Sequence, residues 1–145
     1  MKKEFPYIQG YPLIQVVLIG PKEKIKMLGL LDSGADYSLF SLEVAERLGI
    51  KVEKGKRVSL QGVAGKPFLG FLHEVPVEVE DVILKCKIVF SKVRATLLGR
   101  DNFFLPFLIT FNEKHQKVMI EKHLEELERK GKVKREGEVY FRVET

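Results

Sequence analysis

The stretch Leu30-Leu31-Asp32-Ser33-Gly34-Ala35-Asp36 is the most informative part of the sequence. A carboxylate that directly follows an apolar run is costly to bury unless it is paired. Asp-Ser-Gly then supplies a carboxylate, a hydroxyl and a backbone position that has no Cβ. On its own the tripeptide is more typical of an ordinary turn. Its meaning therefore depends on the rest of the chain.

The segments around this stretch predict a mainly β protein. Residues 14–19 and 25–31 are apolar runs on either side of a Gly-Pro turn, which indicates a hairpin. One short helix is predicted at 41–48, because Ser41 can cap its first turn and Gly49 can end it. Further extended segments are expected at 58–60, 68–72, 75–79, 82–90, 108–111 and 118–120.

The C-terminal part has a different composition. From residue 113 to the end, 17 of 33 residues are charged. The spacing of Ile120, Leu124 and Leu127 predicts a helix ending at Gly131, and 133–143 could form a hairpin. We expect a first domain at 1–121 and a charged extension at 122–145. The extension could be a clamp, a partner-binding surface or a solvated tail, and it could also cover a cleft.

Composition limits the class of protein. With 145 residues, 45% of them apolar and 31% charged, the chain suits one globular domain. No apolar run is long enough to span a membrane, and no signal peptide is visible, so we expect no membrane partner and a cytoplasmic location. The single cysteine, Cys86, excludes an intrachain disulfide and is interpreted as a small buried hydrophobe. The net charge of +5 is interspersed, which argues against a nucleic-acid partner.

A second motif changes the interpretation of Asp-Ser-Gly. Leu97-Leu98-Gly99-Arg100-Asp101 begins 65 residues after Asp32, and a glycine-bearing tip at 61–66 lies between the two motifs. In this order the chain resembles the retropepsin-like, single-domain aspartic proteases, which include retroviral proteases and the related domain of DNA-damage-inducible ubiquitin-shuttle proteins. The resemblance covers residues 12–121. It implies a closed β-barrel, equivalent to one half of a two-domain acid protease, with one short helix after the active-site loop.

The resemblance also implies roles for individual residues. Asp32 would be the catalytic carboxylate, and Ser33 would form a hydrogen bond across a dimer. The remaining implied roles are a loop shaped by Gly34 and Ala35, a structural ion pair between Asp36 and Arg100, a flap at Gly62, Val63, Ala64 and Gly65, and a pocket lining for which Phe68, Val63 and Val93 are candidates.

One Asp-Ser-Gly per chain has a consequence for assembly. Aspartic proteolysis uses two carboxylates, one as a base toward water and one protonated to polarise the scissile carbonyl. The sequence contains a single motif. We therefore expect a homodimer that hydrolyses a protein or peptide substrate bound as an extended strand, with each subunit giving one Asp32.

Three other functions remain open at this stage. The same fold could bind a peptide or protein without cutting it, or serve only as a dimerisation unit. A metal-dependent hydrolase has little support, because His73, His115 and His123 do not fall in a zinc-binding spacing. We therefore expect neither a metal nor a cofactor, and we favour the endopeptidase.

Overall fold

The computed structural model describes residues 2–61, 65–101 and 103–143. Within these residues the chain is mainly β, as predicted. The elements from the N-terminus to the first helix are β1 (Lys2–Pro6), β2 (Leu13–Ile19), β3 (Lys24–Leu31), β4 (Ser38–Ser41) and α1 (Leu42–Leu48). The middle elements are a 3₁₀ turn η1 (Val52–Lys54), β5 (Lys56–Gln61), β6 (Pro67–Val79), β7 (Val82–Ser91) and β8 (Leu97–Leu98). The last elements are β9 (Phe107–Asn112), β10 (Lys117–Lys122), α2 (Leu124–Arg129), β11 (Val133–Glu136) and β12 (Val139–Arg142).

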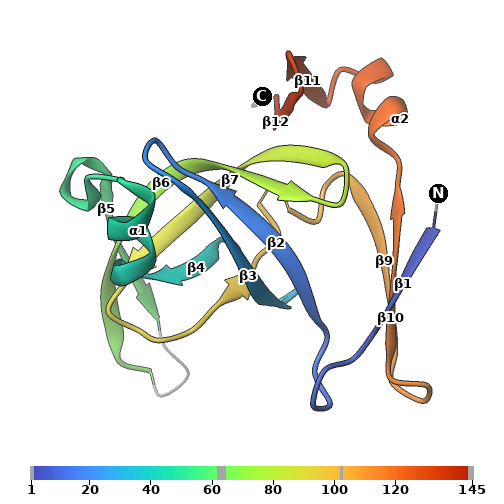
Figure 1. Cartoon of the computed structure of the whole chain (residues 1–145), viewed down its shortest axis with the longest axis horizontal. Coiled ribbons are helices and arrows are strands. Elements are labelled where there is room, and N and C mark those ends of the chain that lie inside the picture. Colours follow the sequence, from blue (N-terminus) through green and yellow to red (C-terminus); the bar gives the residue numbers. More distant parts are fainter. Residues whose placement is uncertain (1, 62–64, 102, 144–145) are drawn as a thin grey trace.

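The strands of the main sheet pair in a circuit around a common core (Figure 1). Starting from β7, the pairings run through β4, β8, β3, β2 and β6 and then return to β7. β5 extends the sheet beside β6, and β12 with β11 extends it beside β7. We call this circuit of paired strands the barrel. It leaves the strands around the active-site motifs with neighbours on both sides.

The core follows the two-residue period of the strands. Val75, Val77 and Val79 of β6 are each at most 2% exposed, because alternate side chains of a strand point to the same face. Their partners on the neighbouring strand β7 are the buried residues Cys86, Leu84 and Val82. Full burial of such a side chain contributes about 1.5–3 kcal/mol, so this pair of strands is a main source of stability.

The predicted helix is confirmed as α1. The Ser41 hydroxyl accepts a hydrogen bond from the Val44 N–H at 3.4 Å. Gly49 ends the helix at φ 82°, a left-handed conformation that favours glycine. Val44, Ala45 and Leu48 form the buried face.

A second, smaller sheet lies beside the barrel, and we call it the terminal sheet. It consists of β1, β10 and β9 in that order, all antiparallel. The prediction that a helix includes Ile120 is wrong. Ile120 lies in β10 and pairs with Lys3 of β1 and Ile109 of β9. α2 therefore begins only at Leu124.

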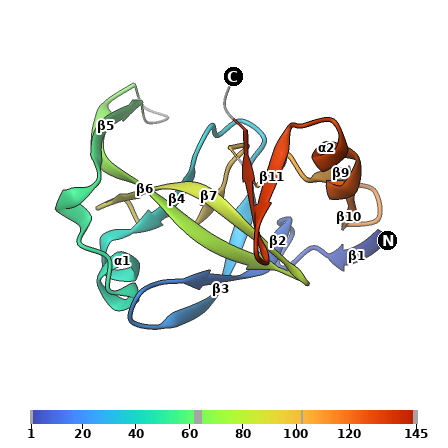
Figure 2. The same ribbon diagram turned by 90° about the horizontal axis from the view of Figure 1, so that it is seen from above.

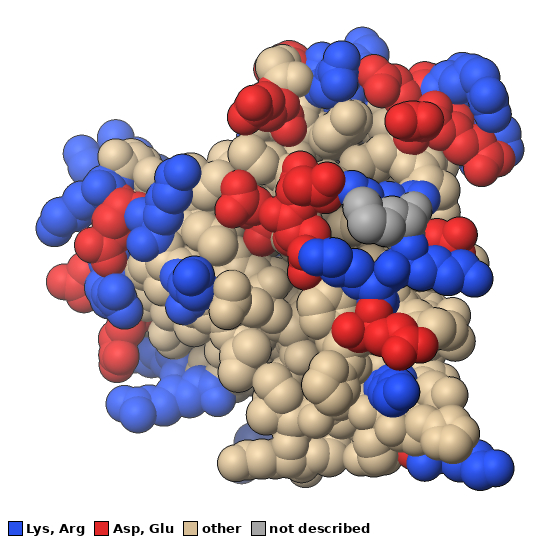
Figure 3. All heavy atoms as spheres, turned by 45° about the vertical axis from the view of Figure 1, so that its right-hand side comes forward, with Lys and Arg blue, Asp and Glu red and all other residues tan. Residues whose placement is uncertain are grey.

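The extension packs on the barrel. β11 and β12 form the predicted hairpin, and β12 runs parallel to β7 through Val139↔Ile83 and Tyr140↔Leu84. Leu124 and Val133 are buried at 7% and 4% exposure. A solvated tail is thus excluded for the described residues of the extension. Figure 3 shows charged side chains of both signs intermixed on this side of the molecule. Neither helix in the described ranges has the length and apolarity to cross a membrane.

Candidate active site

Asp32 lies where β3 ends, on the loop between β3 and β4. β8 lies between these two strands, parallel to β3 through Leu31↔Leu98 and antiparallel to β4 through Leu39↔Leu97. The Asp32 N–H donates to the Leu98 carbonyl at 3.0 Å. The two motifs found in the sequence therefore meet, and the second holds the backbone of the first.

The loop also fixes the carboxylate of Asp32 from within. The Gly34 N–H donates to Asp32 Oδ1 at 2.9 Å, and the Ala35 N–H donates to the Asp32 carbonyl at 3.2 Å. Asp32 itself is half-buried. One carboxylate oxygen of Asp32 is thus oriented by the main chain. The neighbouring Ser33 is exposed.

The rest of the second motif binds the far side of the loop. The Arg100 N–H donates to the Ala35 carbonyl, and the Asp101 N–H donates to the Asp36 carbonyl, both at 2.8 Å. The Arg100 guanidinium lies 3.4 Å from Asp36 Oδ1, with side chains that are 63% and 80% exposed. Solvent-exposed ion pairs contribute little to the free energy of unfolding, typically about 0–1 kcal/mol. The backbone bonds therefore dominate in holding the loop.

Two further residues matter in this arrangement: Ser38, which the sequence analysis did not single out, and Gly99, to which it gave no role. Ser38 is 1% exposed, and its hydroxyl accepts a hydrogen bond from the Gly99 N–H at 3.0 Å. A Cβ at Gly99 would lie 2.4 Å from the Tyr37 carbonyl oxygen, so only glycine fits without a backbone shift. The glycine was visible in the motif, but nothing in the sequence distinguishes Ser38 from a surface serine.

A groove of about 580 Å³ opens beside Asp32. Phe68 and Val93 line it, as predicted from the sequence. Its other lining residues outside the Asp32 loop are mostly apolar, namely Leu39, Leu60, Gln61, Ala95 and Leu97. The site therefore combines a carboxylate with an apolar surface, which suits side chains of a peptide better than a highly charged ligand.

The predicted flap lies only partly in the described chain. Gly62, Val63 and Ala64 are outside the described residues. Gly65 has φ 76° with open space around its Cβ position, and Gln61 pairs with Pro67 across the β5–β6 hairpin. Gln61 and Phe68, on the two strands of this hairpin, both line the groove.

Other chemically active residues lie away from the groove. His73 Nε2 is 2.9 Å from the Val52 carbonyl, and His123 Nε2 is 2.9 Å from the Leu105 carbonyl. In the described part of the chain no three His, Cys, Asp or Glu residues gather in a group that could hold a metal. Cys86 is fully buried, and burial strongly raises the pKa of its thiol, which leaves it a poor nucleophile.

The extension does not cover the groove. β12 pairs with β7 near Ile83 and Leu84, whereas Val93 of the groove lies beyond the other end of that strand. Leu84 and Val93 are nine positions apart, which corresponds to roughly 30 Å of extended chain. Figure 1 likewise shows β11 and β12 on the opposite side of the molecule from the end of β5. For its described residues, 122–143, the extension therefore does not close its own cleft.

Comparison with known proteins identifies the family. A model described as "Aspartyl protease" matches residues 17–101, which include both motifs. This chain belongs to the aspartyl protease family. Its retropepsin-like character, inferred above from the motifs, is also supported by individual relatives.

One curated relative is DNA damage-inducible protein 1 of Kluyveromyces lactis, 36% identical over 74 residues. The alignment covers 49% of this chain and 18% of that protein, so the chain spans less than a fifth of its length.

Two solved structures share the fold of this aspartyl protease. A retropepsin-like aspartic protease from Rickettsia conorii matches with a TM-score of 0.63 and 17% identity, covering 83% of this chain and 89% of that one. EIAV protease complexed with the inhibitor HBY-793 matches with a TM-score of 0.51 and 23% identity, covering 64% and 85%. At these identities the likeness concerns the fold.

Proposed function

We propose that this aspartyl protease is an endopeptidase active as a homodimer, in which each subunit gives one Asp32. The observation that carries the proposal is the geometry of the Asp32 loop. The carboxylate is oriented by the Gly34 N–H at 2.9 Å and lines a groove of about 580 Å³. Membership of the family supports the reaction type.

The chemistry requires a second carboxylate. Two adjacent carboxylates cannot both ionise cheaply, so they share one proton and titrate as a pair. The ionised member takes a proton from water, which attacks the peptide carbonyl, while the protonated member donates a hydrogen bond to the carbonyl oxygen. Asp32 is the only aspartate of the chain in an Asp-Ser-Gly context, so the second carboxylate is assigned to a second copy.

The groove suits an extended peptide. Its lining strands offer backbone groups and apolar side chains on alternate positions, as in other cases where a peptide is bound as an added strand. Phe68 and Val93 are placed to contact substrate side chains. We expect cleavage next to apolar residues.

A subunit-mixing experiment tests the proposal. Wild-type protein is mixed with an equal amount of Asp32→Asn and allowed to exchange subunits, and cleavage of a peptide library is measured. The pure variant should be folded and inactive. In the mixture about half of the wild-type subunits pair with the variant by chance, so activity should fall to about half that of the same wild-type protein alone.

The control for exchange is Ser59→Ala, a change at an exposed position outside the site. Mixing with this variant should give about twice the activity of the same wild-type protein alone, because every dimer of the mixture then has two active subunits. Full cleavage by Asp32→Asn would exclude the proposed chemistry. Peptide binding without cleavage by the wild type would favour the binding module instead.

A further inference from the structure

The positive charge of the chain is interspersed along the sequence, but its excess lies at one end of the molecule. This end consists of the β2–β3 turn, the last turn of α1, η1 and the start of β5, and we call it the basic end. Its residues, 20–26 and 46–57, include three acidic side chains, Glu23, Glu46 and Glu53. They also include eight exposed basic side chains, namely Lys22, Lys24, Lys26, Arg47, Lys51, Lys54, Lys56 and Arg57. The net charge of the basic end is therefore +5, equal to that of the whole chain.

The segments of the basic end are joined in space. The Lys22 N–H donates to the Leu48 carbonyl at 2.9 Å, and a Cβ at Gly49 would lie 2.6 Å from the Cβ of Lys22. The β2–β3 turn therefore packs directly on the end of α1. Figure 2 shows this turn and α1 at one end of the molecule, with β5 leading away from them. Figure 3 shows Lys and Arg side chains gathered at the left-hand end, where α1 and β5 lie in Figure 1.

Most of these cations are not balanced by a neighbouring carboxylate. Arg47 forms an ion pair with Glu23 at 3.2 Å. In the described part of the chain the other seven cations of the basic end form no ion pair. A ligand that carries several carboxylates would therefore meet positive charge that the protein itself does not neutralise.

An apolar groove of about 510 Å³ lies within the basic end, between α1, η1 and β6, and we call it the side groove. Arg57 of β5 is the partner of Phe71 of β6, and opposite residues of antiparallel strands project to the same face. The side groove thus offers apolar contacts next to positive charge. Its apolar lining residues are half-buried, and they are Leu42, Ile50, Val52 and Phe71, with Glu46, Lys51 and Glu53 as the charged ones.

The combination of charge and apolar surface favours a protein segment over a nucleic acid. Nucleic acids are bound mainly through their phosphates, which the carboxylates of Glu46 and Glu53 in the side groove would repel. Single strands are also bound by stacking on several aromatic side chains, whereas Phe71 is the only aromatic residue among the described residues that line the side groove. An acidic protein segment with apolar side chains matches both features of the surface.

β5 connects the basic end to the groove beside Asp32. The strand begins at Lys56, and its last residue, Gln61, lines the groove beside Asp32. Five residue steps along a strand span roughly 17 Å. A protein segment held at the basic end therefore lies within the reach of about six extended residues of the proposed cleavage site.

We propose that the basic end is an exosite, a binding surface outside the groove beside Asp32, for an acidic segment of the protein substrates. The inference rests on the proposed function, since it names the class of substrate that the protease takes. Apolar side chains of the segment occupy the side groove, and its carboxylates face Lys51, Lys54 and Arg57. The exosite holds the substrate while an apolar stretch of the same polypeptide enters the groove beside Asp32.

The first test measures binding separately from cleavage. The probe is a fluorescently labelled peptide of about eight residues, rich in Glu and Leu, and it is titrated with the Asp32→Asn protein. Adding Lys51→Glu together with Lys54→Glu should raise the dissociation constant at least about tenfold, because attraction is replaced by repulsion. The matched control adds Lys132→Glu together with Lys134→Glu, two exposed positions of the extension, and should change the dissociation constant less than about twofold.

The second test measures cleavage by proteins with Asp32 intact. A peptide with apolar residues around its cleavage site is compared with the same peptide joined to the Glu- and Leu-rich segment at either end. The segment should lower KM at least about fivefold and leave kcat nearly unchanged, since its contacts are the same in the ground state and the transition state. The gain should disappear with Lys51→Glu and Lys54→Glu, or near 1 M salt, and should remain in the control variant.

The outcomes separate this inference from the proposed function. If all proteins with Asp32 cleave the plain peptide, but the acidic segment gives no gain and binds the doubly reversed protein as tightly, the exosite is wrong and the homodimeric protease stands. If a single-stranded RNA of the same length displaces the probe at an equal or lower concentration, the assignment to a protein ligand is wrong. If the wild type cleaves neither peptide, the proposed function fails, and a surface for its substrates fails with it.

Discussion

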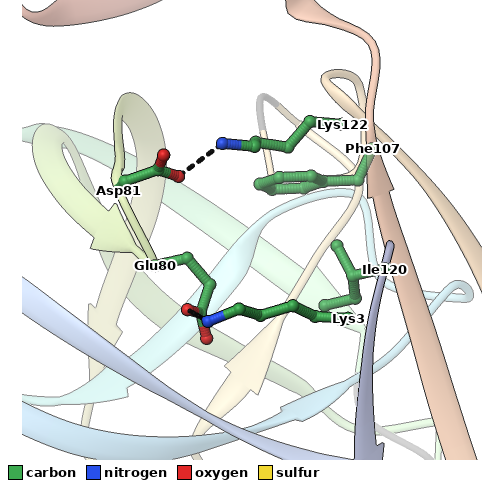
Figure 4. Close-up of a pocket in the computed structure, with 6 residues that line it drawn as sticks. All are labelled: Lys3, Glu80, Asp81, Phe107, Ile120 and Lys122. Atoms are coloured by element: carbon green, nitrogen blue, oxygen red, sulfur yellow. Dashed lines mark hydrogen bonds and ion pairs between the residues drawn. The ribbon is translucent and has the colours of Figure 1, made fainter. Parts of the chain in front are cut away.

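The active-site loop and the terminal sheet are attached to the barrel in different ways. The loop is held by main-chain hydrogen bonds, such as that from Asp32 to Leu98, and by the buried Ser38–Gly99 contact. The terminal sheet is held by two ion pairs, Lys3–Glu80 and Lys122–Asp81, which we call the clamp (Figure 4). The four side chains of the clamp are 27–67% exposed. Main-chain bonds inside a fold respond little to salt or acid, whereas exposed ion pairs respond to both.

The terminal sheet is therefore the part of the molecule that tolerates substitution without damage to the active site. Changes at the loop should affect stability and activity together, because the same bonds that fold the barrel position Asp32. Changes at the clamp should be small and should depend on solution conditions. Substitutions at the loop should therefore have larger effects than substitutions at the clamp.

Gly99→Ala should have the largest effect. Its Cβ would meet the Tyr37 carbonyl oxygen at 2.4 Å, which forces a backbone shift. We expect a loss of about 3 kcal/mol or more in the free energy of unfolding, at the upper end for overpacking, together with loss of peptidase activity. Urea denaturation and peptide cleavage measure the two effects.

Gly131→Ala is the matched control for this change. Gly131 has φ 74° and open space around its Cβ position, so the cost is only that of a left-handed alanine, about 1–2 kcal/mol, with activity retained. Equal losses for the two variants would contradict the close approach at Gly99.

Ser38→Ala should cost less. It leaves the buried Gly99 N–H without its acceptor, and such a loss amounts to about 1–3 kcal/mol. We expect kcat to fall as well, because the same bond positions the second motif. Ser59→Ala, at an exposed position, should stay within about 0.5 kcal/mol of the wild type. An unchanged free energy of unfolding for Ser38→Ala would show that the contact is dispensable.

The Lys122–Asp81 pair of the clamp should be weak. A double-mutant cycle with Lys122→Ala and Asp81→Ala should give a coupling energy of about 0.2–1 kcal/mol at low salt. Near 1 M salt the coupling should become too small to measure. A coupling that persists at high salt would place the clamp in the same class as the active-site loop.

Acid should break the Lys122–Asp81 ion pair. The hydrogen bond from Lys122 lowers the pKa of Asp81 below its usual 3.8. The pair therefore stabilises the fold above about pH 4, and this contribution disappears as the pH falls through the lowered pKa. Comparing the unfolding free energy of the wild type and Asp81→Asn from pH 6 to pH 2 should give a difference below about 1 kcal/mol that vanishes at the acid end.

Sequence reasoning predicted the parts of the fold that depend on local chemistry. The alternation of Val75, Val77 and Val79 indicated a strand, and the Ser41 cap with Gly49 indicated a helix, because each signal lies within the element that it describes. The predicted start of α2 was wrong, because it depends on strands that lie far away in the sequence. Ile120 has helical spacing to Leu124, but pairing with β1 and β9 keeps it in a strand.

The two motifs of the active site could be predicted from the sequence, but the residues that hold them in place could not. Asp32 and Arg100 were singled out because their residue types and order form a known pattern. Ser38 was missed, since its role depends on burial against a glycine that lies 61 positions later. The clamp was missed as well, because Lys3 and Glu80 are 77 positions apart and both resemble ordinary surface charges.

The distance in sequence between the two motifs has a consequence for biosynthesis. The loop that carries Asp32 is completed by Leu98, Gly99 and Arg100, more than sixty positions later. While the chain is being made on the ribosome, the loop cannot adopt its final conformation until Arg100 has left the exit tunnel. A nascent chain therefore cannot complete the Asp32 loop before nearly the whole barrel has been translated.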